Sequence, residues 1–400
     1  MRLDFLEYCQ DKDLPSEWRL DGCQLGNINL IVGKNASGKS RILRSIKFLS
    51  DFLSGEEKLS RLDGRLREWK LTFDSYNGDN KKVYILKVEN SLVIEESYTV
   101  GSKCWLMRDK SGKGKIWAKQ LEKEIDFQTP TNEVAAFHRR DSIQHPFFEE
   151  VYIWANLLRY YEFGTDLGRS SLDAINSESV AIIKKNIDFN NKNHVIRIFK
   201  LGEKELGESF IESIKSDMLL VGYRIDEIGT KTPSTSIFQE DNSYFPEVKQ
   251  QYIYVQESDL KDKTEQSIIS QGMFRALSLI IQVNYSLLAG KPSCILIDDI
   301  GEGLDFERAS AMIKLLISKA EAKSGLVQLI MTTNDRFIMN GVPLDYWSVI
   351  ERQPGLAKLH NIHNSKEIFD DFKFTGLNNF DFFATQFYIE GFGNEENIEQ

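Results

Sequence analysis

The residues best suited to chemistry in this 400-residue chain lie in a glycine-rich segment near the N-terminus. Gly33–Ser40 (GKNASGKS) fits the pattern G-x-x-x-x-G-K-[ST]. Glycines allow a tight turn in which successive backbone N–H groups face one phosphate cluster, and a following helix adds the positive end of its dipole. We expect the Lys39 ammonium to reach the β- and γ-phosphates of ATP and the Ser40 hydroxyl to bind Mg²⁺. The residues predicted to line this site are Gly33, Lys34, Asn35, Ala36, Ser37, Gly38, Lys39, Ser40 and Arg41.

A second chemical feature is an apolar segment that ends in two acids. Cys294–Ile297 is typical of a buried strand, and Asp298 and Asp299 follow it directly. Asp298 is predicted to hold the Mg²⁺ shell, and Asp299 to polarise the water that attacks the γ-phosphate. Glu302 is an alternative base. An acidic strand end that only leads into a turn is the structural alternative.

A third feature is the serine-glycine turn Ser270–Met273, directly before the helical pattern Phe274–Leu288. A Ser-x-Gly turn at a helix N-terminus can bind an anion. It can equally be an ordinary serine N-cap, which is common.

The surrounding pattern predicts the elements that must position these residues. Asn27–Val32 is a short apolar strand and Ser40–Phe52 an amphipathic helix. Residues 68–120 alternate as an antiparallel sheet does, while Cys294–Ile297 and Val327–Met331 resemble buried parallel strands around a helix at Phe306–Ala320. The fold class is therefore α/β. Further helices are expected at Phe147–Tyr161 and Glu208–Leu220.

Four segments are expected along the chain. Residues 1–130 hold the phosphate-binding loop and a β-rich lobe, and residues 131–250 form a mostly helical insertion. Residues 251–350 return to α/β with the serine turn and the acidic strand. Residues 351–400 form an aromatic-rich C-terminal extension, whose phenylalanines are expected to pack on the domain or on a partner subunit.

Composition limits the class of protein. Hydrophobic residues make up 41% of the chain, enough to bury a sizeable core. No apolar run is long enough for a membrane span, and the N-terminus does not resemble a secretory signal, so a cytoplasmic protein without membrane contact is expected. The net charge of −10 restricts any nucleic-acid contact to a local patch. The four cysteines are scattered, which argues against a zinc site or a disulfide framework.

The order of these motifs resembles the ABC-type ATPase heads of the SMC/RecF/OLD-like branch. The likeness rests on Gly33–Ser40, Ser270–Met273, the acidic strand with Gly301–Asp305 (GEGLD), and Thr332–Asp335 (TTND). Within that branch it resembles the stand-alone ATPase subunits of bacterial antiphage systems such as PARIS, Septu and the retron-associated ATPases.

The resemblance implies that two heads enclose two ATP molecules. Ser270, Gly272 and Met273 would cover the γ-phosphate bound by the other head, and Asp305 would belong to the D-loop that crosses the dimer seam. Asn334 occupies the switch position. These expectations give an ATP-dependent homodimer or a larger even-numbered assembly.

Two residues depart from the family pattern. Asp299 stands where a Glu is usual; its side chain is one methylene shorter, and a misplacement of about 1 Å can cost about 10²-fold in rate. Asn334 replaces the usual His and cannot become a cation. Slow turnover is therefore expected. The family's Q-loop glutamine has no clear counterpart, and Gln144 is the only candidate.

The expected function is a slow ATPase that regulates a separate effector in antiphage defence, such as a Toprim or HNH nuclease, with DNA or a phage protein as the trigger. One alternative is a DNA-repair ATPase that acts directly on DNA. Another is a nucleotide-gated scaffold that does not hydrolyse ATP. A transporter ATPase fits least, because the insertion is too long.

Overall fold

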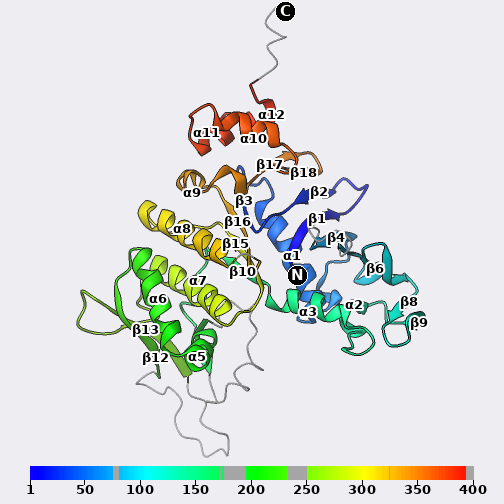
Figure 1. Ribbon diagram of the computed structural model, residues 1–400, viewed down its shortest axis with the longest axis horizontal. Helices are drawn as coiled ribbons and strands as arrows, with labels where there is room; N and C mark the ends of the chain where they lie inside the picture. The colour runs from blue at the N-terminus through cyan, green and yellow to red at the C-terminus, as the bar shows by residue number, and fades with distance from the viewer. Residues whose placement is uncertain (75–80, 172, 175–194, 233–249, 324, 393–400) are drawn as a thin grey trace, which may run out of the picture. The chain divides into compact units, whose positions relative to one another are not determined.

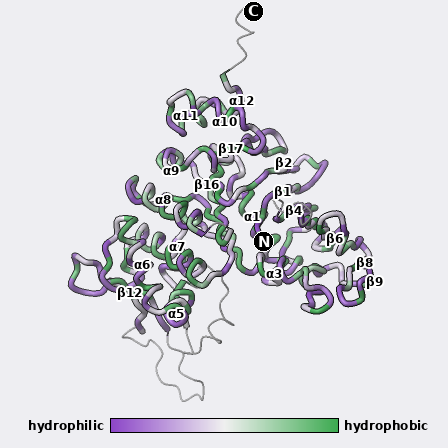
Figure 2. The backbone as a smooth tube through the Cα atoms, viewed as in Figure 1, coloured by the Kyte–Doolittle hydropathy of each residue, from purple (hydrophilic) through white to green (hydrophobic). Residues whose placement is uncertain are grey.

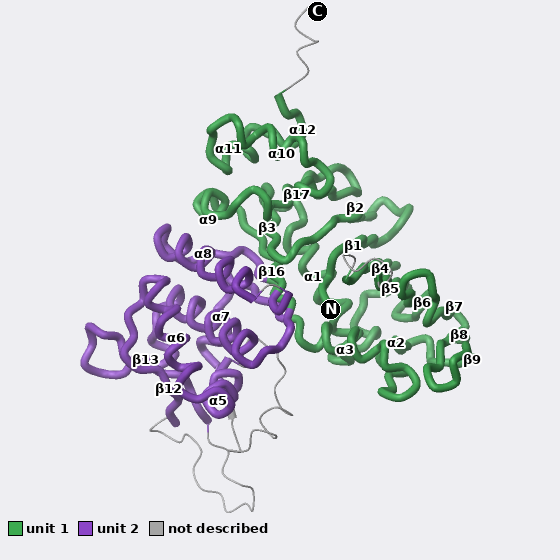
Figure 3. The backbone as a smooth tube through the Cα atoms, in the orientation of Figure 1, with its two compact units in different colours: residues 1–158, 294–296, 328–400 green, residues 159–293, 297–327 purple. Residues whose placement is uncertain are grey.

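The computed structural model describes residues 1–74, 81–171, 173–174, 195–232, 250–323 and 325–392 (Figure 1). The chain forms two compact units (Figure 3). Unit 1 comprises residues 1–158, 294–296 and 328–400, and unit 2 comprises residues 159–293 and 297–327. Unit 2 thus interrupts unit 1 in the sequence, and segments far apart along the chain build unit 1.

Unit 1 is built on one long mixed sheet. Its strands follow in the order β16-β3-β17-β18-β2-β1-β4-β5-β6-β7-β8-β9, and residues 294–296 of β15 (Ser293–Asp298) extend it beyond β16. The strands are β1 (Leu3–Gln10), β2 (Trp18–Gln24), β3 (Ile28–Val32), β4 (Arg67–Phe73), β5 (Lys82–Glu89), β6 (Leu92–Val100), β7 (Lys103–Asp109), β8 (Lys113–Ala118), β9 (Lys123–Gln128), β16 (Val327–Thr333), β17 (Trp347–Gln353) and β18 (Leu356–Asn361).

Strand β3 is the centre of the parallel part of this sheet. It pairs in parallel with β16 on one side, where Leu329 lies opposite Ile28, and with β17 on the other, where Val349 lies opposite Val32. All residues of β3 and β16 are buried. Their near-continuous apolar character is typical of parallel strands, and the expected strands are confirmed.

Strands β4 to β9 form the antiparallel part of the sheet. Each pairs with the next in sequence, as the alternating pattern predicts. The alternation leaves one face buried and the other partly exposed, as in β5.

Helix α1 (Lys39–Ser54) directly follows the glycine-rich loop and confirms the predicted amphipathic helix. Its buried residues recur at helical spacing from Ile42 to Phe52. It packs against α3 (Phe147–Leu157), and the indole N–H of Trp69 in β4 donates to the carbonyl of Ser45 at 3.0 Å. The short elements η1 (Leu59–Arg61) and α2 (Ala135–His138) complete this layer.

Unit 2 combines a helical layer with a small antiparallel sheet. Its helices are α5 (Val195–Leu206), α6 (Glu208–Leu220), α7 (Gln271–Leu288) and α8 (Phe306–Ala322), and α7 packs against both α5 and α6. Apolar and polar residues are interspersed along these helices (Figure 2). The sheet contains β11 (Asp173–Ala174), β12 (Ile225–Lys231), β13 (Gln250–Glu257) and β14 (Thr264–Glu265). Strand β10 (Arg159–Glu162) also belongs to unit 2.

The C-terminal extension is a small aromatic cluster in unit 1. After α9 (Arg336–Gly341) and η4 (Leu344–Tyr346), it contains α10 (Lys366–Lys373), α11 (Asn379–Ala384) and α12 (Phe387–Glu390). The Phe382 ring lies 4.6 Å from that of Phe369, and Phe382 and Trp347 also contact each other. These phenylalanines pack on the domain, as expected, whereas Phe374 is exposed.

The compact units follow boundaries other than the four expected segments. Helix α3 packs on α1 and so belongs to unit 1 instead of the insertion. Its last residues also differ from the prediction, because the helix stops at Leu157 and Arg159–Glu162 forms a strand. Helix α7 groups with α5 and α6, so the serine turn lies in the same unit as most of the inserted residues. No helix within the described ranges is long and apolar enough to cross a membrane.

A buried carboxylate ties the antiparallel strands of unit 1 to α2. Glu96 accepts hydrogen bonds from Arg108 Nε at 2.8 Å, from the Tyr84 hydroxyl at 2.9 Å, and from the backbone N–H groups of Ala135 and Ala136 at 2.8 Å each. Neither side chain of the Glu96–Arg108 pair is exposed. Burial and the neighbouring Glu96 raise the pKa of Tyr84 well above its usual value.

Replacing one partner of this pair should destabilise unit 1 strongly. We expect Arg108→Met to lower the free energy of unfolding by about 3–5 kcal/mol, because the Glu96 charge stays buried without its cation. Urea denaturation followed by circular dichroism measures this. The matched control is Lys87→Met, which removes the partly exposed pair with Glu95 and should cost under about 1 kcal/mol. Equal losses for both variants would contradict the prediction.

Candidate functional site

The glycine-rich loop lies between β3 and α1, as its sequence predicts. Gly33 has no room for a side chain, because a Cβ there would lie 2.3 Å from Ile350 Cγ2. Gly38 has a φ of +111°, in the left-handed region that favours glycine, and faces the Trp18 ring. Both glycines are therefore required for the loop to turn beside the sheet.

The chemistry of this loop fits a polyanion. Helix α1 begins at Lys39 without a side-chain cap and without an acidic residue in its first turn, so its dipole is not neutralised there. The Lys39 ammonium donates to the carbonyls of Gly33 at 2.8 Å and Lys34 at 3.2 Å. The Ser37 hydroxyl is buried and has no hydrogen-bond partner in the described structure. A phosphate group would give this hydroxyl and the helix N-terminus an acceptor.

The switch residue lies at the tip of the same loop. Asn334 Nδ2 donates to Asn35 Oδ1 at 2.8 Å, across 299 positions of sequence. The next residue, Asp335, caps α9 by accepting from the N–H groups of Phe337 at 2.7 Å and Ile338 at 3.1 Å. Unit 1 therefore brings Asn334 to the phosphate-binding loop.

Arg41 occupies a defined place just inside α1. Its guanidinium lies 4.4 Å from the Trp18 ring centroid and donates to Gln10 Oε1 at 2.9 Å. Burial lowers the pKa of Arg41, and repulsion from Arg352 adds to this shift. Arg352 donates to the Ala36 carbonyl at 2.5 Å, a contact that no local sequence pattern predicts.

The two acids lie in unit 2, at the end of β15. Asp298 is buried, its backbone carbonyl accepts from the N–H of Phe163 at 3.0 Å, and its carboxylate accepts from the Tyr160 hydroxyl at 3.3 Å. Asp299 has a φ of +53°. Asp tolerates this left-handed conformation better than most residues, and such backbone strain often occurs at functional sites.

The serine turn begins α7 and contacts Gly301–Asp305, the predicted D-loop. The Ser270 hydroxyl accepts from the N–H of Met273 at 3.4 Å. Ser270 is therefore the N-cap of α7, which is the alternative that the sequence left open. A Cβ on Gly272 would lie 2.8 Å from the carbonyl oxygen of Gly303. Asp305 caps α8 by accepting from the N–H of Arg308 at 3.0 Å. Both segments therefore lie in unit 2, at the starts of two different helices, α7 and α8.

Arg275 links these segments, and sequence reasoning did not identify it. It is buried and donates to three backbone carbonyls: Thr165 at 2.8 Å, Glu302 at 2.8 Å and Gly164 at 2.5 Å. Its position near the start of α7, two residues after Met273, is the one local signal. Tyr160 was also not anticipated, since its partner Asp298 is 138 positions away.

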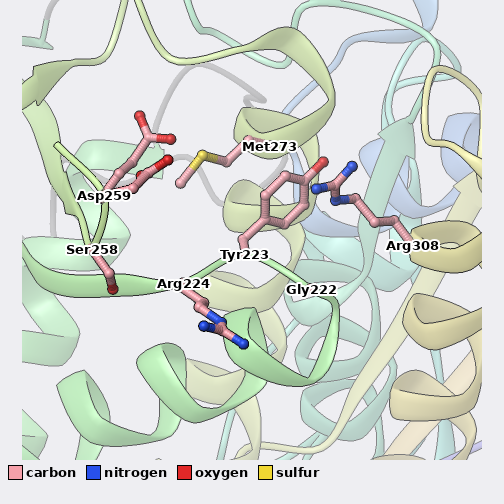
Figure 4. A pocket seen from close by; sticks show the side chains of 8 residues that line it. Gly222, Tyr223, Arg224, Ser258, Asp259, Met273 and Arg308 are labelled. Atoms are coloured by element: carbon pink, nitrogen blue, oxygen red, sulfur yellow. The ribbon is translucent and has the colours of Figure 1, made fainter.

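A cavity of about 430 Å³ lies beside the serine turn in unit 2 (Figure 4). Tyr223, Arg224, Asp259, Met273 and Arg308 are among its lining residues. The Arg308 guanidinium lies 4.5 Å from the Tyr223 ring centroid and is paired with Asp305. The cavity therefore borders both Met273 and the helix that the D-loop begins.

Gln144 and Glu302 are the remaining candidates, for the Q-loop glutamine and for the alternative base. Gln144 lies in a turn whose backbone carbonyl accepts from the N–H of Lys119, next to β8, far along the sheet order from β3. This position does not favour a Q-loop role. Glu302 lies in unit 2 beside Gly164, where an added Cβ would meet its carboxylate at 2.1 Å.

The predicted metal ligands are too few to hold a cation alone. No group of three or more His, Cys, Asp or Glu side chains suited to a metal occurs among the residues that the structure describes. In proteins, Mg²⁺ usually takes phosphate oxygens and water for most of its ligands, so each of the predicted ligands Ser40 and Asp298 needs to supply only one oxygen.

The sequence matches, over residues 28–340, the family described as an AAA domain, putative AbiEii toxin, type IV TA system. The chain belongs to this family. No curated protein matches it.

Several of the solved structures that this AAA domain resembles are SMC heads. One, bound to the C-winged helix domain of ScpA, matches with a TM-score of 0.52 and 15% identity over 90% of this chain and 97% of that one. The SMC head domain from Thermotoga maritima matches at 0.43 and 14%, covering 90% of this chain and 98% of that one. The Smc head from Pyrococcus furiosus matches at 0.46 and 13%, covering 93% and 99%. The first likeness shows the fold alone, and the predicted α/β fold of a P-loop ATPase head is confirmed.

Adding one methyl group at Gly303 tests the contact between the predicted D-loop and α7. Gly303 has a φ of +78°, and a Cβ there would lie 2.1 Å from Arg275 Nη1. We expect Gly303→Ala to destabilise the AAA domain by about 1–3 kcal/mol beyond the backbone strain, because Arg275 must leave a buried hydrogen bond. Urea denaturation gives the value.

Gly290→Ala is the control for this measurement. Its φ of +63° imposes a similar backbone strain, but a Cβ there has nothing within 4 Å. If the two variants unfold at the same urea concentration, the contact between Gly303 and Arg275 does not stabilise the domain.

Proposed function

We propose that this AAA domain binds and slowly hydrolyses ATP, and that two copies close around two ATP molecules to control a separate effector. The observation that carries the proposal is the loop Gly33–Ser40, with an uncapped helix start, a buried lysine and a buried, unpartnered Ser37 hydroxyl. Membership of the AAA family supports nucleotide binding.

The exposed face around the serine turn supports closure by a second copy. Ser270 and Asp305 are exposed, so another molecule can approach both. Two apolar side chains flank them: Ile268 is 69% exposed and Phe306 is 55% exposed. Burying such residues against a partner is favourable, at roughly 25 cal/mol per Å². Ser270, Gly272 and Met273 would then meet the γ-phosphate held by the loop of the other copy.

In the proposed reaction, a water oxygen forms a bond to the γ-phosphorus, and the bond from that phosphorus to the β,γ-bridging oxygen breaks. ADP and inorganic phosphate result, and the water proton passes to Asp299 and then to solvent. Lys39 holds the β- and γ-phosphates, and Asn334 orients the γ-phosphate by hydrogen bonding. Mg²⁺, held by Ser40 and Asp298, would neutralise phosphate charge.

Two features support a dimer that bound ATP holds closed for a long time, instead of an enzyme with rapid turnover. Asp299 is shorter than the usual base, and Asn334 remains neutral. An ATP-closed dimer would therefore persist and could signal to an effector nuclease in antiphage defence. The similar SMC head that is bound to a domain of ScpA supports the idea that a head of this fold takes a protein partner.

Removing the lysine tests nucleotide binding. We expect Lys39→Ala to weaken ATP binding by about 10- to 100-fold or more, because a charge-assisted hydrogen bond contributes about 1.5–3 kcal/mol. Fluorescence titration with a labelled ATP analogue measures the affinity. Lys58→Ala, an exposed lysine after α1, is the control and should bind as the wild type does. Undiminished binding by Lys39→Ala would refute the site.

Removing the proposed base tests the clamp. With ATP and Mg²⁺, Asp299→Ala should accumulate as a stable dimer, because ATP stays intact between the two copies. Size-exclusion chromatography with light scattering measures the mass, and the double variant Lys39→Ala with Asp299→Ala should stay monomeric. A monomeric, ATP-bound Asp299→Ala protein would contradict the sandwich. Wild-type phosphate release no faster than that of Lys39→Ala would favour the non-hydrolytic scaffold.

A further inference from the structure

Arg352 lies beside the phosphate-binding loop because of the register of the parallel strands. Val349 of β17 is opposite Val32, the last residue of β3. Strand β17 then continues past the end of β3, so that Ile350 contacts the position of Gly33. Two residues further on, Arg352 Nη1 donates to the carbonyl oxygen of Ala36 at 2.5 Å. The sheet itself therefore delivers an arginine to the loop.

The arginine and the switch residue meet adjacent positions of the loop. Asn334 contacts Asn35, and Arg352 contacts Ala36. The amide of Asn334 can donate a hydrogen bond but carries no charge, whereas a guanidinium is always protonated in proteins. The neutral Asn334 therefore has a positively charged neighbour, because Arg352 contacts the loop residue next to its own partner.

The charge of Arg352 is not neutralised by a nearby acid. Within the part of the chain that the structure describes, no ion pair joins Arg352 to a carboxylate. The adjacent Glu351 is paired instead with His360, at 2.7 Å, and accepts from Gln353 at 2.8 Å. Arg352 is exposed, so its side chain can turn from the Ala36 carbonyl toward a ligand in the loop. Its repulsion of Arg41 shows that two guanidinium groups share this region.

We infer that Arg352 contacts the γ-phosphate of ATP bound in the same chain and supplies the cation that Asn334 cannot provide. This inference rests on the proposed function. As the bond between the γ-phosphorus and the bridging oxygen breaks, negative charge builds on the phosphate oxygens. A guanidinium placed there stabilises that charge, and arginines in this role raise phosphoryl-transfer rates by about 10³–10⁵-fold.

The test separates the charge of Arg352 from its hydrogen bond to the loop. Arg352→Gln keeps a donor for the Ala36 carbonyl but removes the charge, and Arg352→Lys keeps the charge. Steady-state phosphate release gives kcat and KM for ATP. We expect Arg352→Gln to lower kcat at least about tenfold, and Arg352→Lys to recover part of that loss. The control is Lys358→Gln, an exposed residue opposite Glu351 on β18, with wild-type kinetics expected.

Two outcomes overturn the inference in distinguishable ways. If Arg352→Gln hydrolyses ATP with wild-type kcat and KM, Arg352 only fastens the loop, and the proposed function stands without it. If the wild-type protein releases phosphate no faster than Lys39→Ala, the proposed hydrolysis fails and the role of Arg352 fails with it. Thermal melting of each variant shows that a loss of kcat does not come from unfolding.

Discussion

The uncapped start of α1 is the constraint on which the arrangement of unit 1 depends, because its first turn carries no acid that would neutralise the helix dipole. Gly38 provides no side-chain cap, the first turn has no acid, and Lys39 is buried against carbonyls of its own loop. The Ser37 hydroxyl is buried without a partner in the described structure. Such a concentration of donors is stable only in a rigid frame, and β3, held between β16 and β17, provides one.

Unit 2 shows a second constraint, which couples the serine turn to the D-loop. Arg275 binds the carbonyls of Gly164, Thr165 and Glu302, and Gly272 lies against the carbonyl of Gly303. The serine turn and residues 301–305 are therefore joined by direct contacts.

The structure shows the surroundings of Asp299 and Asn334, the two residues that depart from the pattern of the resembled ATPase heads. Asp299 occupies a left-handed backbone position, which Asp tolerates better than Glu. Asn334 binds Asn35 at the loop tip, and Arg352 stands next to it. Under the proposed function, the short side chain of Asp299 and the neutral Asn334 favour a long-lived ATP-bound state over rapid turnover.

The sequence by itself determined the local elements and the phosphate chemistry. Apolar periodicity located α1, α6, α7 and α8, and the pattern Gly33–Ser40 located the loop, since both depend on residues close together in the chain. Only the tertiary structure decided which residues complete the sites. Arg275 and Gly164 are 111 positions apart, and Arg352 and Ala36 are 316 apart. Strand register and helix packing create these contacts, and no local pattern encodes them, because each arginine alone resembles any exposed charge.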